Sequence, residues 1–142
     1  IAALATGSVG QALAEKAIAS GEILKVAETA VKPFYEKRSR QAIEWIHEFF
    51  AGSDYWIHRS EGAIFLWLYL RDLKISTKEL YEKLKEQGVI TVPGEHFFFG
   101  VDDPRENCHG HYDKCLRLNY SGPQDEVREG LKLLAKIYKE YV

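Results

Sequence analysis

The sequence predicts a two-layer α+β domain, in which helices pack on a small, mostly antiparallel sheet, preceded by a long kinked connecting helix. Two observations lead to this prediction. Segments with helical spacing of apolar residues alternate with short segments rich in β-branched and aromatic residues, and glycine or proline separates most of them. The chain of 142 residues is also long enough to bury a substantial core.

The N-terminal third is expected to be helical. Residues Ser8–Ser20 carry apolar side chains at helical intervals and stop at Gly21, which suits a helix end. Helical spacing continues over Glu22–Phe50, but Pro33 lacks a backbone donor and should kink or split this long element. A long broken helix between a small-residue segment and a compact remainder is typical of a connector between two domains.

The compact part is expected to contain strands and helices in turn. The connecting helix ends at Gly52–Asp54, and the predicted strands are Tyr55–His58, Gly62–Leu70, Val89–Val92 and Cys115–Ser121. Ser76 and Glu79 form the pattern of a capping box, so a helix should begin there. The last helix should begin near Pro123. Its predicted buried residues are Val127, Leu131, Leu134, Tyr138 and Tyr141.

Composition excludes several classes of protein. The net charge is −2 and no run of basic residues occurs, which argues against a nucleic-acid-binding protein. No apolar stretch reaches the roughly 18 residues of a membrane span, so no membrane partner is expected. Two cysteines are too few for a disulfide framework, which favours a reducing cytoplasm. Because the chain starts at Ile1 with small apolar residues, we expect a fragment whose remainder covered this end.

Five potential metal ligands lie close together near the last strand. They are Cys108, His109, His111, Asp113 and Cys115. Their spacing differs from the paired C-x-x-C of structural zinc sites, and the final cysteine already belongs to the strand. Two interpretations stay open: a small metal-binding or interaction module built on Cys108–Cys115, or a polar loop with two exposed histidines, which the spacing favours.

The last strand places an arginine opposite a core face. Leu116, Leu118 and Tyr120 alternate with Arg117 and Asn119, so the two sets point to opposite faces of the sheet. A guanidinium held next to a core is costly without a partner. Arg117 is therefore either a structural salt-bridge residue of an edge strand or a receptor for an anion.

Four segments in order resemble the C-terminal small domain of the fold-type I, pyridoxal-phosphate-dependent aminotransferases. They are KPFYEKR (Lys32–Arg38), EGAIFLWLYL (Glu61–Leu70), GVITVPGEHFF (Gly88–Phe98) and CLRLNYS (Cys115–Ser121). Each motif is modest by itself, but the same order over essentially the whole chain argues against coincidence. The resemblance implies the fold of an aminotransferase small domain.

The resemblance also implies a role for Arg117. In this family an arginine at this place receives the α-carboxylate of the amino-acid substrate, and a planar guanidinium offers two parallel N–H donors that match a carboxylate. Asn119 faces the same way and is expected to orient the arginine. The resemblance therefore favours an anion receptor over a structural salt bridge.

Five further residues match positions that line the substrate site in the family. Gly62 and Ala63 match a small-residue stretch where the backbone approaches the substrate, although tight strand packing is the alternative. Pro93, Gly94 and Phe97 match a turn near the mouth of the active site. For these three, a place in the core or in an interdomain contact is an equal alternative.

The resemblance finally implies an activity and a division of the chain. The parent enzyme would use pyridoxal phosphate to move an amino group between an L-amino acid (valine or alanine) and a 2-oxo acid (pyruvate or 2-oxoisovalerate), acting as a homodimer. No lysine stands in the family's Ser-x-x-Lys setting, since Lys78 follows Ser-Thr on the first turn of a capped helix. We therefore expect residues 1–21 to be a remnant of the large cofactor-binding domain, 22–50 the connecting helix and 51–142 the small domain, inactive by itself.

Overall fold

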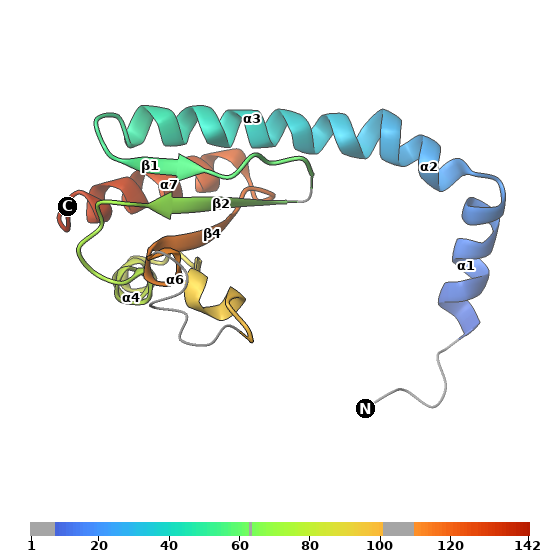
Figure 1. Cartoon of the computed structure of the whole chain (residues 1–142). Helices are drawn as coiled ribbons and strands as arrows, with labels where there is room; N and C mark the ends of the chain where they lie inside the picture. Colours follow the sequence, from blue (N-terminus) through green and yellow to red (C-terminus); the bar gives the residue numbers. More distant parts are fainter. Residues whose placement is uncertain (1–7, 63, 101–109) are drawn as a thin grey trace.

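The fold consists of a compact body and a helical arm that runs away from it (Figure 1). The computed structural model describes residues 8–62, 64–100 and 110–142. The arm, which we define as Ser8–Val31, contains α1 (Ser8–Ala19), α2 (Glu22–Val26) and the π-helical turn η1 (Ala27–Val31). It continues into α3 (Lys32–Phe49), the long helix of the body. None of the described helices is both long enough and apolar enough to span a membrane.

The expected break in the long helix is a π-helical turn placed just before Pro33. In a regular α-helix the ring of Pro33 would meet the carbonyl of Thr29, four residues earlier. Thr29 lies inside η1, where the amide of Lys32 reaches back to the carbonyl of Ala27. The hydroxyl of Thr29 also donates a 2.7 Å hydrogen bond to the carbonyl of Lys25, a contact that bends helices. The proline and the threonine together account for the interruption.

Four antiparallel strands form one sheet in the order β1-β2-β4-β3. Their bounds are Tyr55–Ile57 for β1, Phe65–Leu70 for β2, Val92–Pro93 for β3 and Cys115–Asn119 for β4. Three of the predicted strands are thus present with shorter ends, and the prediction of a strand over Val89–Val92 is largely wrong. The amide of Val89 instead donates to the carbonyl of Leu84, because Gly88 (φ 79°) closes helix α4 with a left-handed residue.

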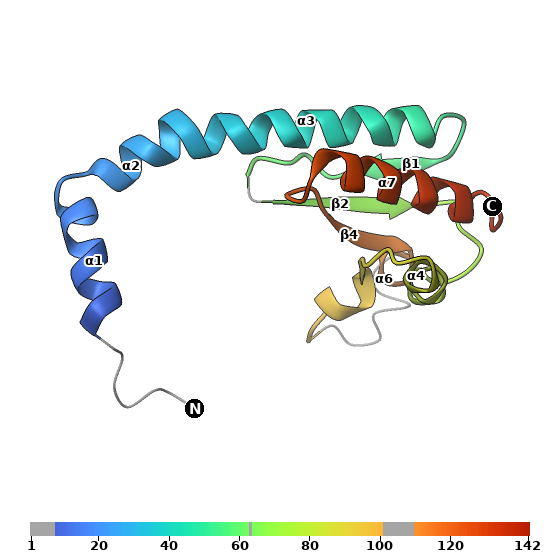
Figure 2. The same ribbon diagram turned by 180° about the vertical axis from the view of Figure 1, so that it is seen from behind.

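One face of the sheet packs on α3 and α7 (Gln124–Tyr138), which lie side by side (Figure 2). The sheet contributes Leu66, Leu68, Leu70, Leu116 and Leu118 to this core, and the helices contribute Ala42, Ile46, Leu131, Leu134 and Tyr138. As predicted, α7 follows Pro123 directly, and Val127 and Tyr141 are partly buried against the core. The C-terminal half of α3 is therefore an integral part of the body.

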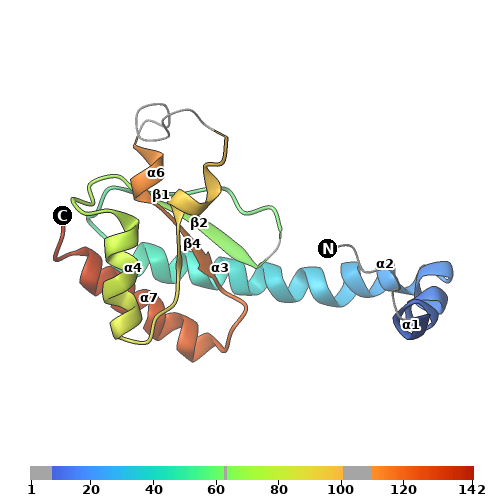
Figure 3. The same ribbon diagram turned by 90° about the horizontal axis from the view of Figure 1, so that it is seen from below.

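The opposite face of the sheet carries smaller elements. These are the 3₁₀ turn η2 (Gly94–Phe97) and the short helix α6 (His111–Lys114), while α4 (Thr77–Glu86) lies beside β3. Figure 3 shows α6 on the other side of the sheet from α3 and α7. The predicted capping box of α4 is confirmed, because Ser76 and Glu79 each accept a hydrogen bond from the other's backbone amide. This second face is the one on which Arg117 lies.

Candidate functional site

Arg117 lies in the middle of β4, on the face of the sheet that points away from the core. It stands opposite Trp67 of β2 on one side and Val92 of β3 on the other. Its neighbours along the strand, Leu116 and Leu118, are buried in the core, whereas Arg117 is half-buried. The predicted alternation of the strand is confirmed, and the backbone of a central strand fixes the point from which the side chain of Arg117 extends.

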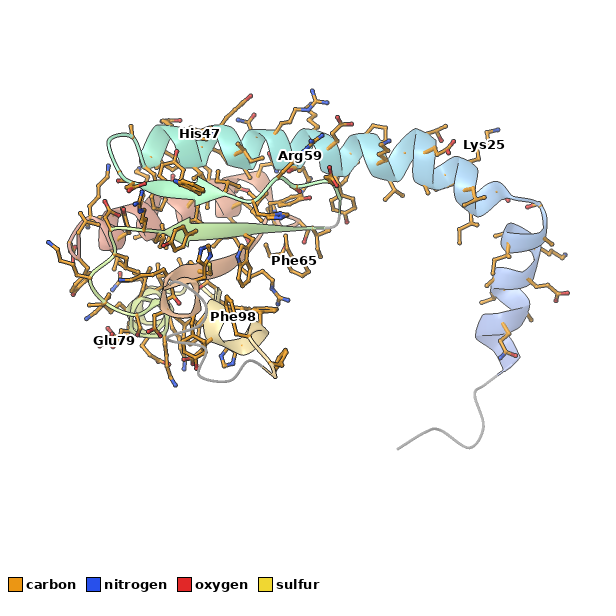
Figure 4. The ribbon with its side chains drawn as sticks, viewed as in Figure 1. Lys25, His47, Arg59, Phe65, Glu79 and Phe98 are labelled. Atoms are coloured by element: carbon orange, nitrogen blue, oxygen red, sulfur yellow. The ribbon has the colours of Figure 1, made fainter. Side chains whose placement is uncertain are left out.

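Two phenylalanine rings hold the guanidinium. The Cζ atom of Arg117 is 4.2 Å from the ring centroid of Phe65 and 5.1 Å from that of Phe97. The ring of Trp67 meets Phe97 edge-on, with centroids 5.1 Å apart and an interplanar angle of 87°. Figure 4 shows Phe65 at the start of β2. Both arginine contacts lie within the range in which a cation is attracted to an aromatic face.

No acidic partner neutralises Arg117 within the described part of the chain. Glu61, which lies in the segment before β2, forms an exposed ion pair with Arg59 at 3.4 Å. Neither an ion pair nor a hydrogen bond joins Arg117 to any other described residue. The structural salt bridge that the sequence left open is thus absent among residues 8–62, 64–100 and 110–142, and no carboxylate of these residues occupies the N–H groups of the guanidinium.

A pocket of about 310 Å³ opens beside Arg117. The 58–62 segment forms one wall, and Phe65 and Trp67 form another. Gly62 belongs to this wall and is exposed, and a Cβ atom there would meet nothing within 4 Å. Tight strand packing therefore does not explain Gly62, whereas its neighbour Ala63 lies outside the described residues.

The other predicted site residues separate into two groups. Phe97 joins the site through its contact with Arg117, and its side chain is 39% exposed. Pro93 and Gly94 are buried behind it, and a Cβ atom on Gly94 would lie 2.7 Å from the carbonyl oxygen of Cys115. Pro93 and Gly94 therefore hold η2 against β4 and support the site from behind.

Asn119 makes a different contact from the one expected. Its side-chain oxygen accepts a 2.8 Å hydrogen bond from the backbone amide of Ser121, within the turn that follows β4. Among the described residues no hydrogen bond joins Asn119 to Arg117, and the groups in contact with the guanidinium are the two aromatic rings.

The described residues do not support the alternative of a metal-binding module. Cys108 and His109 lie outside them, and no group of three or more metal-ligating side chains gathers in the described ranges. The Nδ1 atom of His111 is 3.7 Å from the Sγ atom of Cys115, and the imidazole stacks on Tyr69 with 4.3 Å between ring centroids. Burial raises the pKa of the Cys115 thiol to about 11, which disfavours its thiolate form.

The pocket at Arg117 does not fit the covalent attachment of pyridoxal phosphate. That cofactor needs a lysine amine for its Schiff base, and no lysine lines this pocket. Lys114 donates to the backbone carbonyl of Leu73, and Lys78 forms an ion pair with Glu95 at 3.3 Å. The pocket is suited to an anion rather than to the cofactor.

Two residues at the site, and one that anchors the turn after β4, were missed by the sequence analysis. Phe65 and Trp67 could have been found from their two-residue spacing, which places both on the face opposite the core. Arg38 on α3 donates a 2.8 Å hydrogen bond to the carbonyl of Ser121 and another to Gly122, and so ties α3 to the turn after β4. Only its place in the KPFYEKR segment hinted at this role.

Comparisons with known proteins give a consistent result. The profile of the family "Aminotransferase class I and II" matches residues 3–134. Valine–pyruvate aminotransferase of Escherichia coli (strain K12) is 40% identical over 136 residues, covering 96% of this chain and 32% of that protein. Aromatic-amino-acid aminotransferase 1 of Thermococcus litoralis is 32% identical over 138 residues, covering 96% of this chain and 30% of that protein.

The same family appears among solved structures. Valine–pyruvate aminotransferase of Salmonella typhimurium LT2 superposes with a TM-score of 0.87 at 40% identity, covering 96% of this chain and 34% of that chain. The chain thus spans about a third of the length of the relatives it matches. These matches confirm the predicted α+β fold of an aminotransferase small domain, and they show that the chain is similar to valine–pyruvate aminotransferases.

Proposed function

The chain belongs to the class I and II aminotransferases, and on this premise we propose that Arg117 receives the α-carboxylate of the amino-acid substrate. The observation that carries the proposal is the state of its guanidinium. It is fixed on a central strand between two aromatic rings, it opens onto a pocket, and no described carboxylate neutralises it. Such a group binds a carboxylate through two parallel N–H···O bonds, which fix the orientation as well as the position of the ligand.

The family and the named relatives support a proposal for the reaction. The whole enzyme is proposed to move an amino group between an L-amino acid, such as valine or alanine, and a 2-oxo acid, such as pyruvate or 2-oxoisovalerate. The 40% identity to a protein named valine–pyruvate aminotransferase supports this choice. We propose in addition that the enzyme acts as a homodimer in the cytoplasm.

Pyridoxal phosphate is proposed to be bound by a part of the enzyme other than the described residues. When bound, it supplies the electron sink that makes the amino group transferable. The residues of this chain perform the binding step. Arg117 holds one end of the substrate, and because the carboxylate and the amino group share one carbon atom, fixing the first limits where the second can lie. Gly62 leaves the pocket wall open beside the bound carboxylate.

We propose the domain division that the sequence predicts, with one refinement. Residues 1–21 belong with the large domain, 22–50 form the connecting helix and 51–142 form the small domain. The buried positions Ala42, Ile46 and Phe50 support counting the last turns of the connecting helix as part of the small-domain core. The first turns, which are exposed, support a link toward the large domain.

Substitution of Arg117 in the full-length holoenzyme tests the proposal. Charge-assisted hydrogen bonds contribute roughly 1.5–3 kcal/mol, so Arg117→Ala should lower kcat/KM for valine by about ten- to a hundredfold or more. Arg117→Lys keeps the charge but loses the paired donors, and should recover only part of the loss. Isobutylamine, which is valine without its carboxylate, should be affected much less by either substitution.

Two controls separate binding from stability. Cofactor loading should be unchanged in both variants, because the proposal places the cofactor in another part of the enzyme. Equal losses for valine and isobutylamine, together with a lower melting temperature, would show that Arg117 is a structural residue and would refute the proposal.

A further inference from the structure

We propose that Phe65 and Phe97 are positioning residues, whose rings hold the Arg117 guanidinium so that its paired donors face the substrate. The inference rests on the proposed role of Arg117, and it concerns the groups that hold the guanidinium in its binding orientation before the substrate arrives. An arginine has several rotatable bonds, and fixing such a side chain costs conformational entropy at the moment of binding. A side chain that is already fixed before the substrate arrives avoids this cost.

The two rings are well placed for this task. Phe65 comes from β2 and Phe97 from η2, so the contacts come from separate elements of the fold. The distances from Cζ of Arg117 to the ring centroids, 4.2 and 5.1 Å, are both within the roughly 6 Å range of cation–π attraction. Phe65 stands opposite Asn119, two pairs along from the pair of Trp67 and Arg117, so it reaches the guanidinium along a diagonal.

Aromatic rings hold the arginine without neutralising it. A carboxylate at the same place would pair with the guanidinium and compete with the carboxylate of the substrate. An aromatic face attracts the cation but accepts no strong hydrogen bond, so the contacts with the two rings do not use the N–H donors. Within the described ranges, Glu61 is paired with Arg59, and the side-chain oxygen of Asn119 accepts from the amide of Ser121.

Phe97 is itself held from behind. Trp67 meets it edge-on at 5.1 Å, in the geometry that two aromatic rings prefer. Gly94 lets η2 approach β4 more closely than any side chain would allow, since an added Cβ would lie 2.7 Å from the carbonyl oxygen of Cys115. The ring of Phe97 is therefore fixed relative to the strand that carries Arg117.

The test compares Phe97→Leu with Phe97→Tyr in the full-length holoenzyme. Loss of one cation–π contact should raise KM for valine about two- to thirtyfold and leave kcat nearly unchanged, because substrate and transition state use the carboxylate contact alike. Phe97→Tyr keeps the ring and should restore KM. KM for isobutylamine should not change in either variant. Calorimetric titration with isobutyrate, a carboxylate without an amino group, should show the same weakening for Phe97→Leu.

A matched control is available on the other side of the molecule. Phe49→Leu removes a ring 5.5 Å from the Cζ atom of Arg128, away from the site, and should leave KM for both substrates unchanged. If Phe97→Leu lowers the folded fraction, Phe65→Leu provides a second test of the positioning role of the two rings. Both rings are partly exposed, so leucine leaves no large cavity.

The outcomes distinguish the two proposals. If Arg117→Ala fails to discriminate between valine and isobutylamine, the role of Arg117 itself is wrong. If Arg117→Ala discriminates but Phe97→Leu and Phe65→Leu leave KM for valine unchanged, or impair both substrates equally, only the positioning role is overturned. In the Arg117→Ala background, Phe97→Leu should add no further loss for valine, and a full additional loss would contradict action through the arginine.

Discussion

At the scale of single residues, the site depends on what surrounds Arg117 as much as on the arginine. Its partners in the sheet are Trp67 and Val92, neither of which can form an ion pair with it. The close packing that supports this arrangement depends on one position without a side chain. At Gly94, β4 and η2 approach so closely that a Cβ would lie 2.7 Å from the oxygen and 2.8 Å from the Cβ of Cys115.

Gly94→Ala should therefore destabilise the protein. The added methyl group meets backbone that cannot move aside without shifting β4 or η2, and overpacking of this kind costs about 1–3 kcal/mol. Denaturant unfolding measures the loss in the free energy of unfolding. Gly130→Ala in α7 is the matched control, because its added Cβ would meet only Val89 Cγ1 at 3.9 Å. That change should stabilise the protein by about 0.5–1 kcal/mol, so equal effects of the two substitutions would contradict the packing argument.

The sequence predicts the face of the sheet on which Arg117 lies, but not the contacts of its guanidinium with the rings of Phe65 and Phe97. The alternation of Leu116, Arg117 and Leu118 is a local pattern, and a strand period of two residues converts it directly into two faces. The contact with Phe65 depends instead on how β2 and β4 are paired, and the contact with Phe97 depends on a turn that folds back over the sheet. Neither can be obtained from spacing along the chain.

At the scale of elements, α4 shows both a success and a failure of local prediction. Its start was predicted because a capping box is made by side chains three residues apart, and Ser76 and Glu79 make it. Its end was predicted at Gly88, but Val89–Val92 were predicted to be a strand, and of these only Val92 belongs to β3. A glycine with positive φ can end a helix and be followed by further helix-capping bonds, and here the amide of Val89 makes one. After this glycine Val89 is partly buried against the core and Thr91 is buried, whereas Ile90 is 69% exposed, so their β-branched character alone did not establish a strand.

The capping box gives α4 a defined response to substitution and to pH. Ser76→Ala should lower the free energy of unfolding by about 1 kcal/mol at neutral pH, because the amide of Glu79 loses its acceptor. Hydrogen bonds from the backbone and side chain of Ser76 hold the pKa of Glu79 below its ordinary value of 4.5. A lowered pKa stabilises the folded state above the ordinary value, and this contribution disappears as the pH falls through the lowered pKa.

Thermal unfolding between pH 7 and pH 3 measures how the contribution of Glu79 to the stability of the folded state changes with pH. The difference in stability between the unmodified protein and Glu79→Gln should be largest near neutral pH and should shrink on acidification below 4.5. A difference that stays constant over that range would mean that the carboxylate form of Glu79 does not support the cap.

At the scale of the whole molecule, the contrast is between the body and the arm. The body buries a continuous apolar core between the sheet, α3 and α7, whereas the arm extends away from it (Figure 1). Large apolar side chains of the arm are exposed to solvent: Val9, Leu13, Ile18, Ile23, Leu24, Val26 and Val31. Because helices in proteins gain most of their stability from packing, the arm should be the least stable part of the described chain.

Hydrogen exchange of the isolated 142-residue chain should report this contrast. Amides of α1 and α2 should exchange with little protection, whereas amides around Ile46 on α3 and Leu134 on α7 should be protected nearly to the free energy of global unfolding. Equal protection of the arm and of α7, in a sample shown to be monomeric, would contradict the prediction.

The position of Arg117 between two core leucines ties correct folding to correct function. If β4 slid by one residue along β2, every side chain on it would change faces. The leucines would then point to the pocket, and the guanidinium would enter the apolar layer against α3 and α7, where an unpaired charge is very costly. A chain with the shifted register would therefore be less stable, whether or not substrate is bound. Stable folding therefore requires the register in which Arg117 faces the pocket, and molecules stable enough to persist are those in which it does.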